Sequence, residues 1–424
     1  MTIKTRFRRI IHEPNLSRNA LFGETCALEP RAVVQSIPLT WRKAVDFSVF
    51  DDLGNKFIDM TSGIFVTNSG HANPLIKRAI QRQLDTGLFF AYNYPTRIKH
   101  DFLKKLLSLS PRHFDRAILL NSGSEAVDAA YKLIKLWGAK HGRRRIVTFS
   151  GSYHGRGLSN DLICGRKDNA SWSGVKDGTV HFLPFPYKDS LRFDPKKLPP
   201  REEIAAFFLE TFQGWGAWFY PRGYVNELCA FARRIGALVC FDDMQGGFYR
   251  LGTLYGYMTY GADIRPDILC LGKGLSSCLP LSAVLSRKEI VDVDPSADLH
   301  GTHSGNPLCC AAALANLRFL SGRGQLAGLQ RRIRVFESAM ARLAKLPSIL
   351  QVNVRGLIAG IIVDRTEKAT AIVRACVRNG VLPVCTNRNS IKLAPPLTIA
   401  PDAIREAAEV LRSAILSSSE GPHD

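Results

Sequence analysis

Short apolar runs that end on polar or glycine-rich residues recur through the first two thirds of the chain. Five of these runs predict strands, at residues 117–120, 146–149, 204–209, 237–241 and 268–271. Segments with the apolar spacing of a helix separate several of them, as at residues 225–235. Because strand, helix and strand alternate, the pattern predicts an α/β fold with a mostly parallel sheet flanked by helices.

The pattern is different at the two ends of the chain. Between residues 45 and 60, two extended runs surround Asp52-Leu53-Gly54-Asn55, which predicts a hairpin. Beyond residue 350, short strands alternate with helices, and the last helix is predicted at residues 401–416. We therefore expect a large domain at residues 67–310 and a smaller α+β domain built from residues 1–66 and 311–424.

The composition suits a globular protein of two domains, because 46% of the 424 residues are apolar. No apolar run approaches the ~18 residues that a membrane-spanning helix needs, so we expect no membrane partner. The ten cysteines form neither a Cys-x-x-Cys pair nor a cluster with histidine. This usage predicts a reducing, cytoplasmic location and no metal site.

The formal net charge of +20 raises the question of an acidic partner such as nucleic acid. The basic residues are mostly dispersed, and the tightest cluster, at residues 143–145, lacks the interleaved aromatic residues of a single-strand binder. We interpret the charge as a solvated basic surface without a nucleic-acid partner. A basic, non-catalytic binding protein is the alternative from a different functional class.

Two strand ends bear complementary chemical groups. One predicted strand stops on Asp242, and another stops just before Gly272-Lys273-Gly274. If both strands are parallel, their carboxyl ends lie at the same edge of the sheet. A lysine between glycines is suited to imine formation, and a nearby carboxylate can keep a pyridine nitrogen protonated. The alternative is an ordinary salt bridge between the two side chains.

A phosphate site is predicted where the strand at residues 117–120 runs into Asn121-Ser122-Gly123-Ser124 and then into a helix. Ser122 and Glu125 have the spacing of a capping box. The amide groups and the positive dipole end of such a helix attract an anion. Gly123 would let phosphate approach closely, and Ser124 would donate a hydrogen bond.

Two further loops reach the same edge of the predicted sheet. The first contains Tyr153-His154-Gly155-Arg156, where Tyr153 could stack on a planar cofactor and Arg156 could bind a carboxylate through two hydrogen bonds. For His154 we favour a structural role over a direct catalytic one. The second loop follows the strand at residues 204–209 and begins with Glu210, which brings another acid to this edge.

In combination these motifs resemble those of a class III aminotransferase of the pyridoxal-phosphate fold type I superfamily, of the 4-aminobutyrate, ornithine or diamine type. The resemblance covers nearly the whole chain and implies pyridoxal 5'-phosphate as cofactor in the large domain. It implies that Lys273 forms the Schiff base, that Asp242 pairs with the pyridinium nitrogen and that Gln245 lies near the phenolic oxygen. It also implies a homodimer with shared active sites, in which Thr302 reaches the phosphate of the neighbouring subunit.

The substrate residues depart from the family pattern at one informative position. Members that use 2-oxoglutarate carry an arginine just before the Leu-x-Pro-Pro-Leu segment, where this chain has Lys392. Lysine lacks the planar fork of arginine, so pyruvate or another 2-oxo acid becomes the expected acceptor. An aliphatic residue such as Ile64 at its position resembles the pattern of the 4-aminobutyrate type. Glu210 is expected to pair with Arg156 when no second carboxylate is bound.

The predicted reaction is ping-pong transamination from an amine or amino acid, of the ω-amino acid or diamine type, to a 2-oxo acid. Lys273 would move the proton as general acid and base. An alternative keeps the cofactor and the lysine but changes the chemistry, because amino-acid racemases and decarboxylases share this scaffold.

Overall fold

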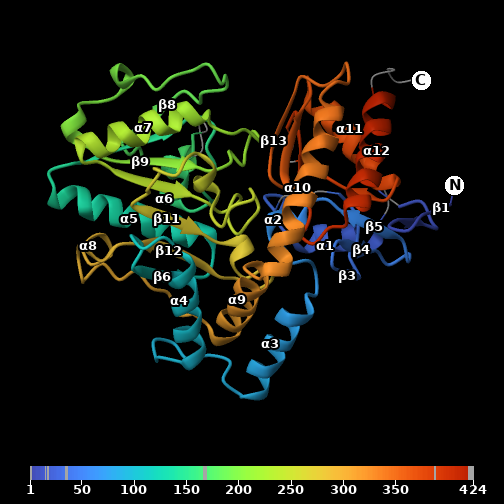
Figure 1. Ribbon diagram of the computed structural model, residues 1–424, viewed down its shortest axis with the longest axis horizontal. Coiled ribbons are helices and arrows are strands. Elements are labelled where there is room, and N and C mark those ends of the chain that lie inside the picture. The colour runs from blue at the N-terminus through green and yellow to red at the C-terminus, as the bar shows by residue number, and fades with distance from the viewer. Residues whose placement is uncertain are drawn as a thin grey trace. The chain divides into compact units, whose positions relative to one another are not determined.

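The computed structural model describes residues 2–14, 16, 19–33, 37–165, 170–385 and 388–418 (Figure 1). The chain divides into two compact units. One unit is the continuous segment Pro74–Ser321, and the other combines Met1–Asn73 with Gly322–Asp424.

The unit Pro74–Ser321 is built on a seven-stranded sheet with the strand order β6-β12-β11-β10-β9-β7-β8. Its strands are β6 (Arg116–Leu120), β7 (Arg145–Phe149), β8 (Val180–Leu183), β9 (Ile204–Glu210), β10 (Leu238–Asp242), β11 (Ile268–Leu271) and β12 (Ser282–Ser286). β10 is parallel to both β9 and β11, and β7 is parallel to both β8 and β9. β12 is antiparallel to β11 and β6. The mostly parallel sheet is confirmed.

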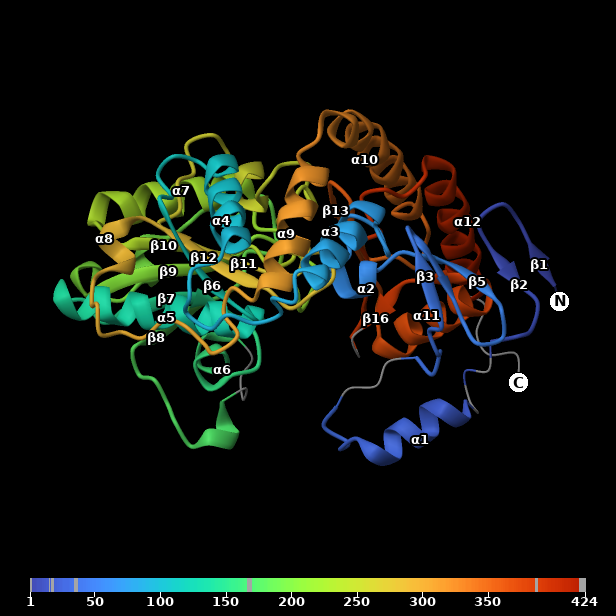
Figure 2. The same ribbon diagram turned by 90° about the horizontal axis from the view of Figure 1, so that it is seen from below.

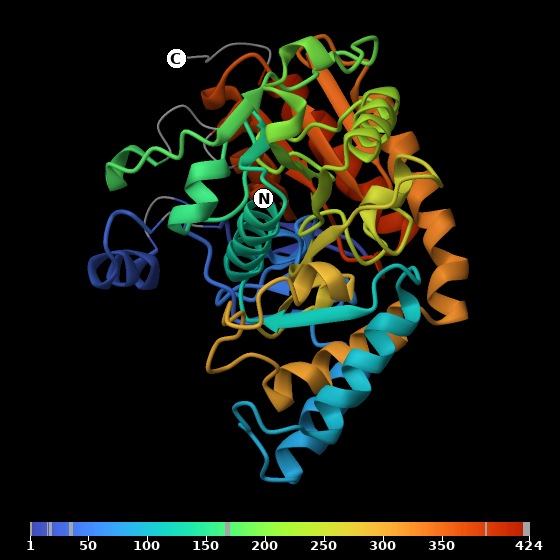
Figure 3. The same cartoon turned by 90° about the vertical axis from the view of Figure 1, so that its left-hand side faces the viewer.

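Helices cover the sheet on both sides. The helices of this unit are α3 (Pro74–Asp85), α4 (Arg97–Leu109), α5 (Gly123–Lys140), α6 (Leu158–Ile163), α7 (Arg222–Ile235), α8 (Lys288–Val291) and α9 (Pro307–Leu320). α5 and α7 lie on opposite faces (Figure 2, Figure 3). This arrangement explains why β9, with the sequence IAAFFLE, is buried at every residue: a parallel strand covered on both faces is apolar throughout.

The core on one face of the sheet is formed by α5. Its buried residues Ala130 and Leu133 pack in one cluster with Phe208, Cys240 and Val284 of the strands. Burying a large apolar side chain of this kind contributes about 2 kcal/mol. The cluster therefore anchors the first turn of α5 at the carboxyl end of the sheet, where β6 runs directly into the helix.

The other unit contains two smaller sheets. One has the order β1-β2-β5-β4-β3 with β15 paired to β5, and the other has the order β13-β14-β17-β16. The strands are β1 (Ile3–Lys4), β2 (Arg9–Ile10), β3 (Lys43–Val45), β4 (Ser48–Phe50), β5 (Lys56–Asp59), β13 (Gln351–Arg355), β14 (Ile358–Ile362), β15 (Val381–Leu382), β16 (Val384–Cys385) and β17 (Ser390–Leu393). β4 and β5 form the predicted hairpin, with Ser48 opposite Ile58. Because β15 pairs with β5, the two ends of the chain share one sheet.

The helices of this unit are α1 (Ala20–Leu28), α2 (Ser62–Phe65), α10 (Arg323–Leu343), α11 (Thr366–Arg378) and α12 (Pro401–Ser417). α12 corresponds to the last helix, predicted at residues 401–416. Among the described residues of the chain, no helix is long and apolar enough to cross a membrane.

Five helices and strands of the larger unit were not predicted, namely α4, α6, α8, β8 and β12. α4 could have been predicted from the apolar spacing of its sequence, because its buried residues Phe102 and Leu106 lie one helical turn apart. β8 and β12 are short and carry little periodicity, and β12 becomes a fully buried strand only because β6 and β11 flank it. Short strands of this kind depend on their neighbours for their identity.

Candidate active site

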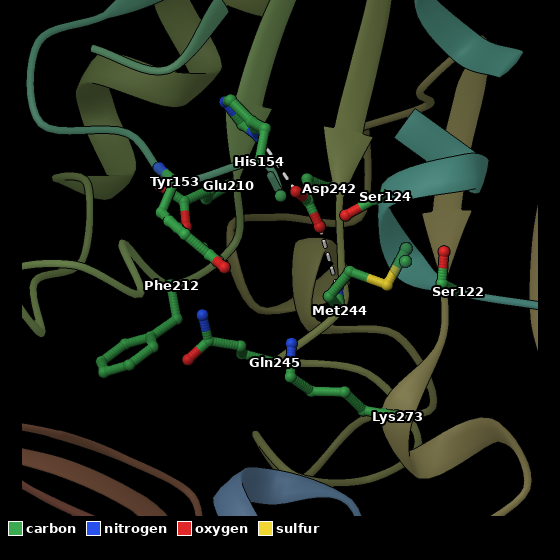
Figure 4. A pocket seen from close by; sticks show the side chains of 12 residues that line it. Ser122, Ser124, Tyr153, His154, Glu210, Phe212, Asp242, Met244, Gln245 and Lys273 are labelled. Carbon is green, nitrogen blue, oxygen red and sulfur yellow. Dashed lines mark hydrogen bonds and ion pairs between the residues drawn. The ribbon is translucent and has the colours of Figure 1, made fainter. Parts of the chain in front are cut away.

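A pocket of about 540 Å³ opens at the carboxyl edge of the seven-stranded sheet (Figure 4). Its lining comprises Ser122, Gly123, Ser124, Tyr153, His154, Gly155, Glu210, Phe212, Asp242, Met244, Gln245 and Lys273. Nine of the predicted site residues are in this set, and they come from five different strand ends or loops. The parallel direction of the strands brings them together, because each loop leaves the sheet at the same edge.

The first turn of α5 forms one wall of the pocket. Ser122 Oγ accepts a hydrogen bond from the backbone N–H of Glu125, and the Glu125 carboxylate accepts one from the backbone N–H of Ser122, so the predicted capping box is present. The helix is 18 residues long, and its amide groups and dipole favour an anion at this end. Ser124 Oγ lies in the same turn and accepts from the backbone N–H of Arg156 at 3.2 Å.

Asp242 is the last residue of β10 and is 5% exposed. One carboxylate oxygen lies 2.9 Å from His154 Nδ1, and the other accepts from the backbone N–H of Met244 at 3.1 Å. Both contacts are visible in Figure 4. A neutral His154 must carry its proton on Nδ1 to make this contact, so the histidine orients the carboxylate. This position agrees with a structural role for His154.

Lys273 follows β11 in a short 3-10 helix, Lys273–Leu275. Its backbone has a φ of 44°, a left-handed conformation that a residue with a side chain adopts at some cost. Burial lowers the pKa of Lys273, although Asp242 and Glu210 oppose the shift. Among the ion pairs of the described residues none joins Lys273 to Asp242, so the simple salt bridge considered from the sequence is not formed.

Glu210 ends β9 and is 2% exposed. Its carboxylate accepts from the backbone N–H groups of Tyr153, at 3.0 Å, and Gly214, at 2.8 Å. Burial raises the pKa of Glu210 to about 7, and the charge of Asp242 adds to the shift. The expected pairing with Arg156 is not formed among the described residues, because the Arg156 side chain is exposed while Glu210 is bonded to the backbone.

Gln245 is held against the loop that follows Glu210. A Cβ atom on Gly214 would lie 1.7 Å from Gln245 Nε2, so the amide packs directly on the bare backbone of that glycine. Gly214 is therefore needed at this position to let Gln245 reach the pocket.

Three residues of the site were missed by sequence reasoning. Phe212 and Met244 line the pocket, each two residues beyond a strand-end acid, where the chain has left the strand and bends or turns. Their nearness in the sequence to Glu210 and Asp242 is the signal that could have identified both of them. Trp215 stacks on Tyr153 with ring centroids 5.8 Å apart and planes 16° apart, and no local pattern predicts this pair.

The remaining predicted residues lie outside this pocket. Thr302 is exposed in the loop before α9, and Arg156 is exposed beside the first turn of α5. Ile64 and Lys392 belong to the other unit. Ile64 has a left-handed backbone and is 46% exposed, and Lys392 is a buried residue of β17 with its Nζ 5.9 Å from the ring centroid of Phe65.

Known proteins resemble this chain over nearly its whole length. A family model described as aminotransferase class-III matches residues 31–415. A 2-aminoadipate transaminase from Pseudomonas putida is 30% identical over 420 residues, which cover 92% of this chain and 99% of that protein. An acetylornithine aminotransferase from Bacillus subtilis is 30% identical over 380 residues, which cover 89% of this chain and 95% of that protein.

The fold is similar to that of solved structures. An ornithine aminotransferase from Toxoplasma gondii has a TM-score of 0.83 and 25% sequence identity to this chain. The match covers 94% of this chain and 96% of that chain.

Proposed function

The chain belongs to the class III aminotransferases and is a pyridoxal-phosphate-dependent transaminase of fold type I, and we propose that Lys273 and Asp242 are its catalytic pair. The resemblance, the enzyme class and the cofactor inferred from the motifs are thereby confirmed. The observation that supports the catalytic pair is the pocket itself. Asp242 ends β10, Lys273 follows β11, and the first turn of α5 lines the same cavity.

The pocket residues fit the three reactive parts of pyridoxal phosphate. The first turn of α5, with Gly123 and Ser124, suits the phosphate group. The buried carboxylate of Asp242 suits a protonated pyridine nitrogen, and the amine of Lys273 suits the aldehyde. We further assign the Tyr153 ring to the face of the pyridine and the Gln245 amide to its phenolic oxygen.

When bound, the cofactor supplies an electron sink for the negative charge that develops at the Cα of the substrate. Lys273 Nζ would accept the proton from this Cα and deliver it to C4′ of the cofactor, a role that its lowered pKa favours. Asp242 would hold the proton on the pyridine nitrogen, and His154 keeps the carboxylate in position through the 2.9 Å contact. Glu210, bonded to two backbone N–H groups, is assigned to hold the loop that carries Tyr153.

For the amino donor we propose an ω-amino acid or a diamine, with Arg156 binding a carboxylate where the substrate has one. The relatives support a donor with a second polar group, since they include a 2-aminoadipate transaminase and a probable 4-aminobutyrate aminotransferase. For the acceptor we propose pyruvate or a similar 2-oxo acid, because Lys392 lacks the two-pronged geometry of arginine. Ile64 is assigned to the side chain of the substrate.

We also propose a homodimer with shared active sites in a cytoplasmic setting. The exposed position of Thr302 is compatible with a contact to the phosphate bound by a second subunit. All ten cysteines are free thiols, as is usual in a reducing compartment. Thr302→Ala should leave the dimer intact in sedimentation and weaken cofactor binding. A monomeric enzyme with full activity would contradict this assignment.

A panel of donors and acceptors tests the proposed reaction. We would assay 4-aminobutyrate, ornithine, a linear diamine and several α-amino acids against pyruvate and 2-oxoglutarate. The expected result is formation of amino acid from the 2-oxo acid with ω-amino donors. The same reactions are followed for CO2 release and α-proton exchange, and either of these without amino transfer would support the decarboxylase or racemase alternative.

A further inference from the structure

A second cavity, of about 950 Å³, opens at the opposite edge of the seven-stranded sheet. Leu238 begins β10, Asp267 directly precedes β11, and Arg287 directly follows the antiparallel β12, so all three lining residues lie at the amino edge of the parallel strands. β10 spans five residues from Leu238 to Asp242. At ~3.3 Å per residue, this places the cavity ~13 Å from the cofactor pocket. The two sites are therefore separate.

The cavity carries an excess of positive charge. Arg233, Arg265 and Arg287 line it, and among its described lining residues the carboxylate is Asp267. Three arginines against one aspartate leave a formal charge of +2 with His113 neutral. Both oxygens of Asp267 are already engaged, one with Arg287 Nη1 at 2.7 Å and the other with the backbone N–H of Val239 at 2.8 Å. The Asp267 carboxylate therefore does not neutralise the positive charges of Arg233 and Arg265.

The three arginines Arg233, Arg265 and Arg287 are not all explained by interactions with the carboxyl ends of helices. Arginines near the last turn of a helix commonly bond to its carbonyl groups or offset its dipole. Arg233 lies in the last turn of α7 and donates to the backbone carbonyl of Asp263 at 3.0 Å. Arg265 and Arg287 are outside any helix, and Arg265 makes no ion pair with a described carboxylate. Both side chains are exposed at the cavity. Arg287 pairs with Asp267 at 2.7 Å and lies 3.9 Å from Glu289, so Arg265 is the one of the two without an ion pair among the described residues.

His113 supplies a second, independent observation. Its Nε2 is buried and has no hydrogen-bond partner among the described residues, and His113 is one of the residues that line the cavity. A buried polar atom without a partner carries a cost of about 1–3 kcal/mol, which a bound ligand would remove. The charged groups that face His113 are Arg265, Asp267 and Arg287. Burial lowers the pKa of His113, and the two arginines lower it further.

We propose that this cavity is a binding site for a polyvalent oxyanion of the phosphate class, held by Arg265, Arg287 and His113. The inference is independent of the proposed transamination site. An anion between the two arginines would offset their repulsion of a protonated His113, so binding should be accompanied by proton uptake at Nε2. Binding should then strengthen as the pH falls, because the protonated ring donates a charge-assisted hydrogen bond.

The test is calorimetric titration of the holoenzyme with inorganic pyrophosphate at constant ionic strength. Loading with pyridoxal phosphate fills the phosphate position at α5, so the titration reports on the second site. We expect saturable binding at one site per chain, about tenfold tighter at about pH 6 than at about pH 8 when the affinities are compared for the same ionic form of pyrophosphate, which itself gains protons over this range. Absence of saturable binding at millimolar pyrophosphate, or equal affinity at both pH values, would overturn the proposal.

Single-residue variants test whether pyrophosphate binds in this cavity. Arg265→Gln should weaken pyrophosphate binding by tenfold or more, since a hydrogen bond to a charged group contributes about 1.5–3 kcal/mol. Arg192→Gln is the matched control, because Arg192 is an exposed arginine of the same unit that pairs with Glu227 at 3.6 Å, away from the cavity. Transaminase activity should be unchanged in both variants. Equal loss of affinity in both variants would show a non-specific effect of charge and overturn the site.

Discussion

Glu210 and Asp242 occupy register-matched positions at the ends of the neighbouring parallel strands β9 and β10. Strands of a sheet lie about 4.8 Å apart, so two buried carboxyl groups meet at this edge. They are held differently, Glu210 by two backbone N–H groups and Asp242 by His154 and one backbone N–H. Burial and the nearby charge of Asp242 raise the pKa of Glu210, so Glu210 holds its proton to a higher pH than an ordinary glutamate.

This pair predicts a pH dependence of stability in the apoenzyme. Burial raises the pKa of Glu210 from 4.5 to about 7 in the folded chain. Between these values the folded chain keeps a proton that the unfolded chain has released, so stability falls as the pH rises through this window. The contribution is about 3 kcal/mol.

Urea unfolding at about pH 5 and about pH 7.5 measures the effect. Glu210→Gln should reduce the loss of stability between the two pH values, because glutamine does not ionise. Glu202→Gln, at an exposed position, should retain the full loss. An unchanged pH slope in Glu210→Gln would contradict the assignment of the proton to Glu210.

Lys273→Ala should lower transaminase turnover by at least about 10³-fold, because both covalent attachment of the cofactor and proton transfer depend on this amine. Borohydride reduction followed by mass spectrometry should find the cofactor on Lys273 in the wild-type enzyme and not in the variant. Lys288→Ala, which removes an exposed lysine of α8, serves as the control. Turnover near the wild-type rate in Lys273→Ala would contradict the assignment of Lys273 as the catalytic lysine.

Gly214→Ala should weaken cofactor binding about tenfold, the loss expected when one hydrogen bond of about 1.4 kcal/mol is removed. The added Cβ would lie 1.7 Å from Gln245 Nε2 and displace the amide. Gln245→Ala should have the same effect, and the double variant should be no worse than either single one, since both act on one contact. Gly178→Ala is the control, because its Cβ would meet nothing within 4 Å. Additive losses in the double variant would show that Gly214 does not act through Gln245.

Lys392→Arg should raise kcat/KM for 2-oxoglutarate about tenfold relative to pyruvate, because a guanidinium group can bind a carboxylate through two parallel hydrogen bonds. Lys345→Arg, at an exposed position, should leave the ratio unchanged. A wild-type enzyme with strong preference for 2-oxoglutarate would refute the role assigned to Lys392.

The local pattern of apolar and polar residues was sufficient to predict where five strands end and which chemical groups follow them. Apolar runs located β6, β7, β9, β10 and β11. The residues that follow these strands include the predicted phosphate site at residues 121–124, the loop with Tyr153, the acid Glu210 and Lys273. Parallel direction alone then assigned these groups to one edge. This worked because a buried strand and the loop that leaves it are specified by residues that are adjacent in the chain.

The tertiary structure alone decided which side chains meet. Glu210 bonds to the backbone of Tyr153, 57 positions away, where the sequence suggested Arg156. Met244 lies against Gly123 and Gly272, and Trp215 stacks on Tyr153. The second cavity likewise gathers Arg233, Arg265 and Arg287 from three separate segments. The physical reason is that such contacts depend on strand order and packing across the sheet, which are determined by interactions between distant segments and are not encoded in any local pattern.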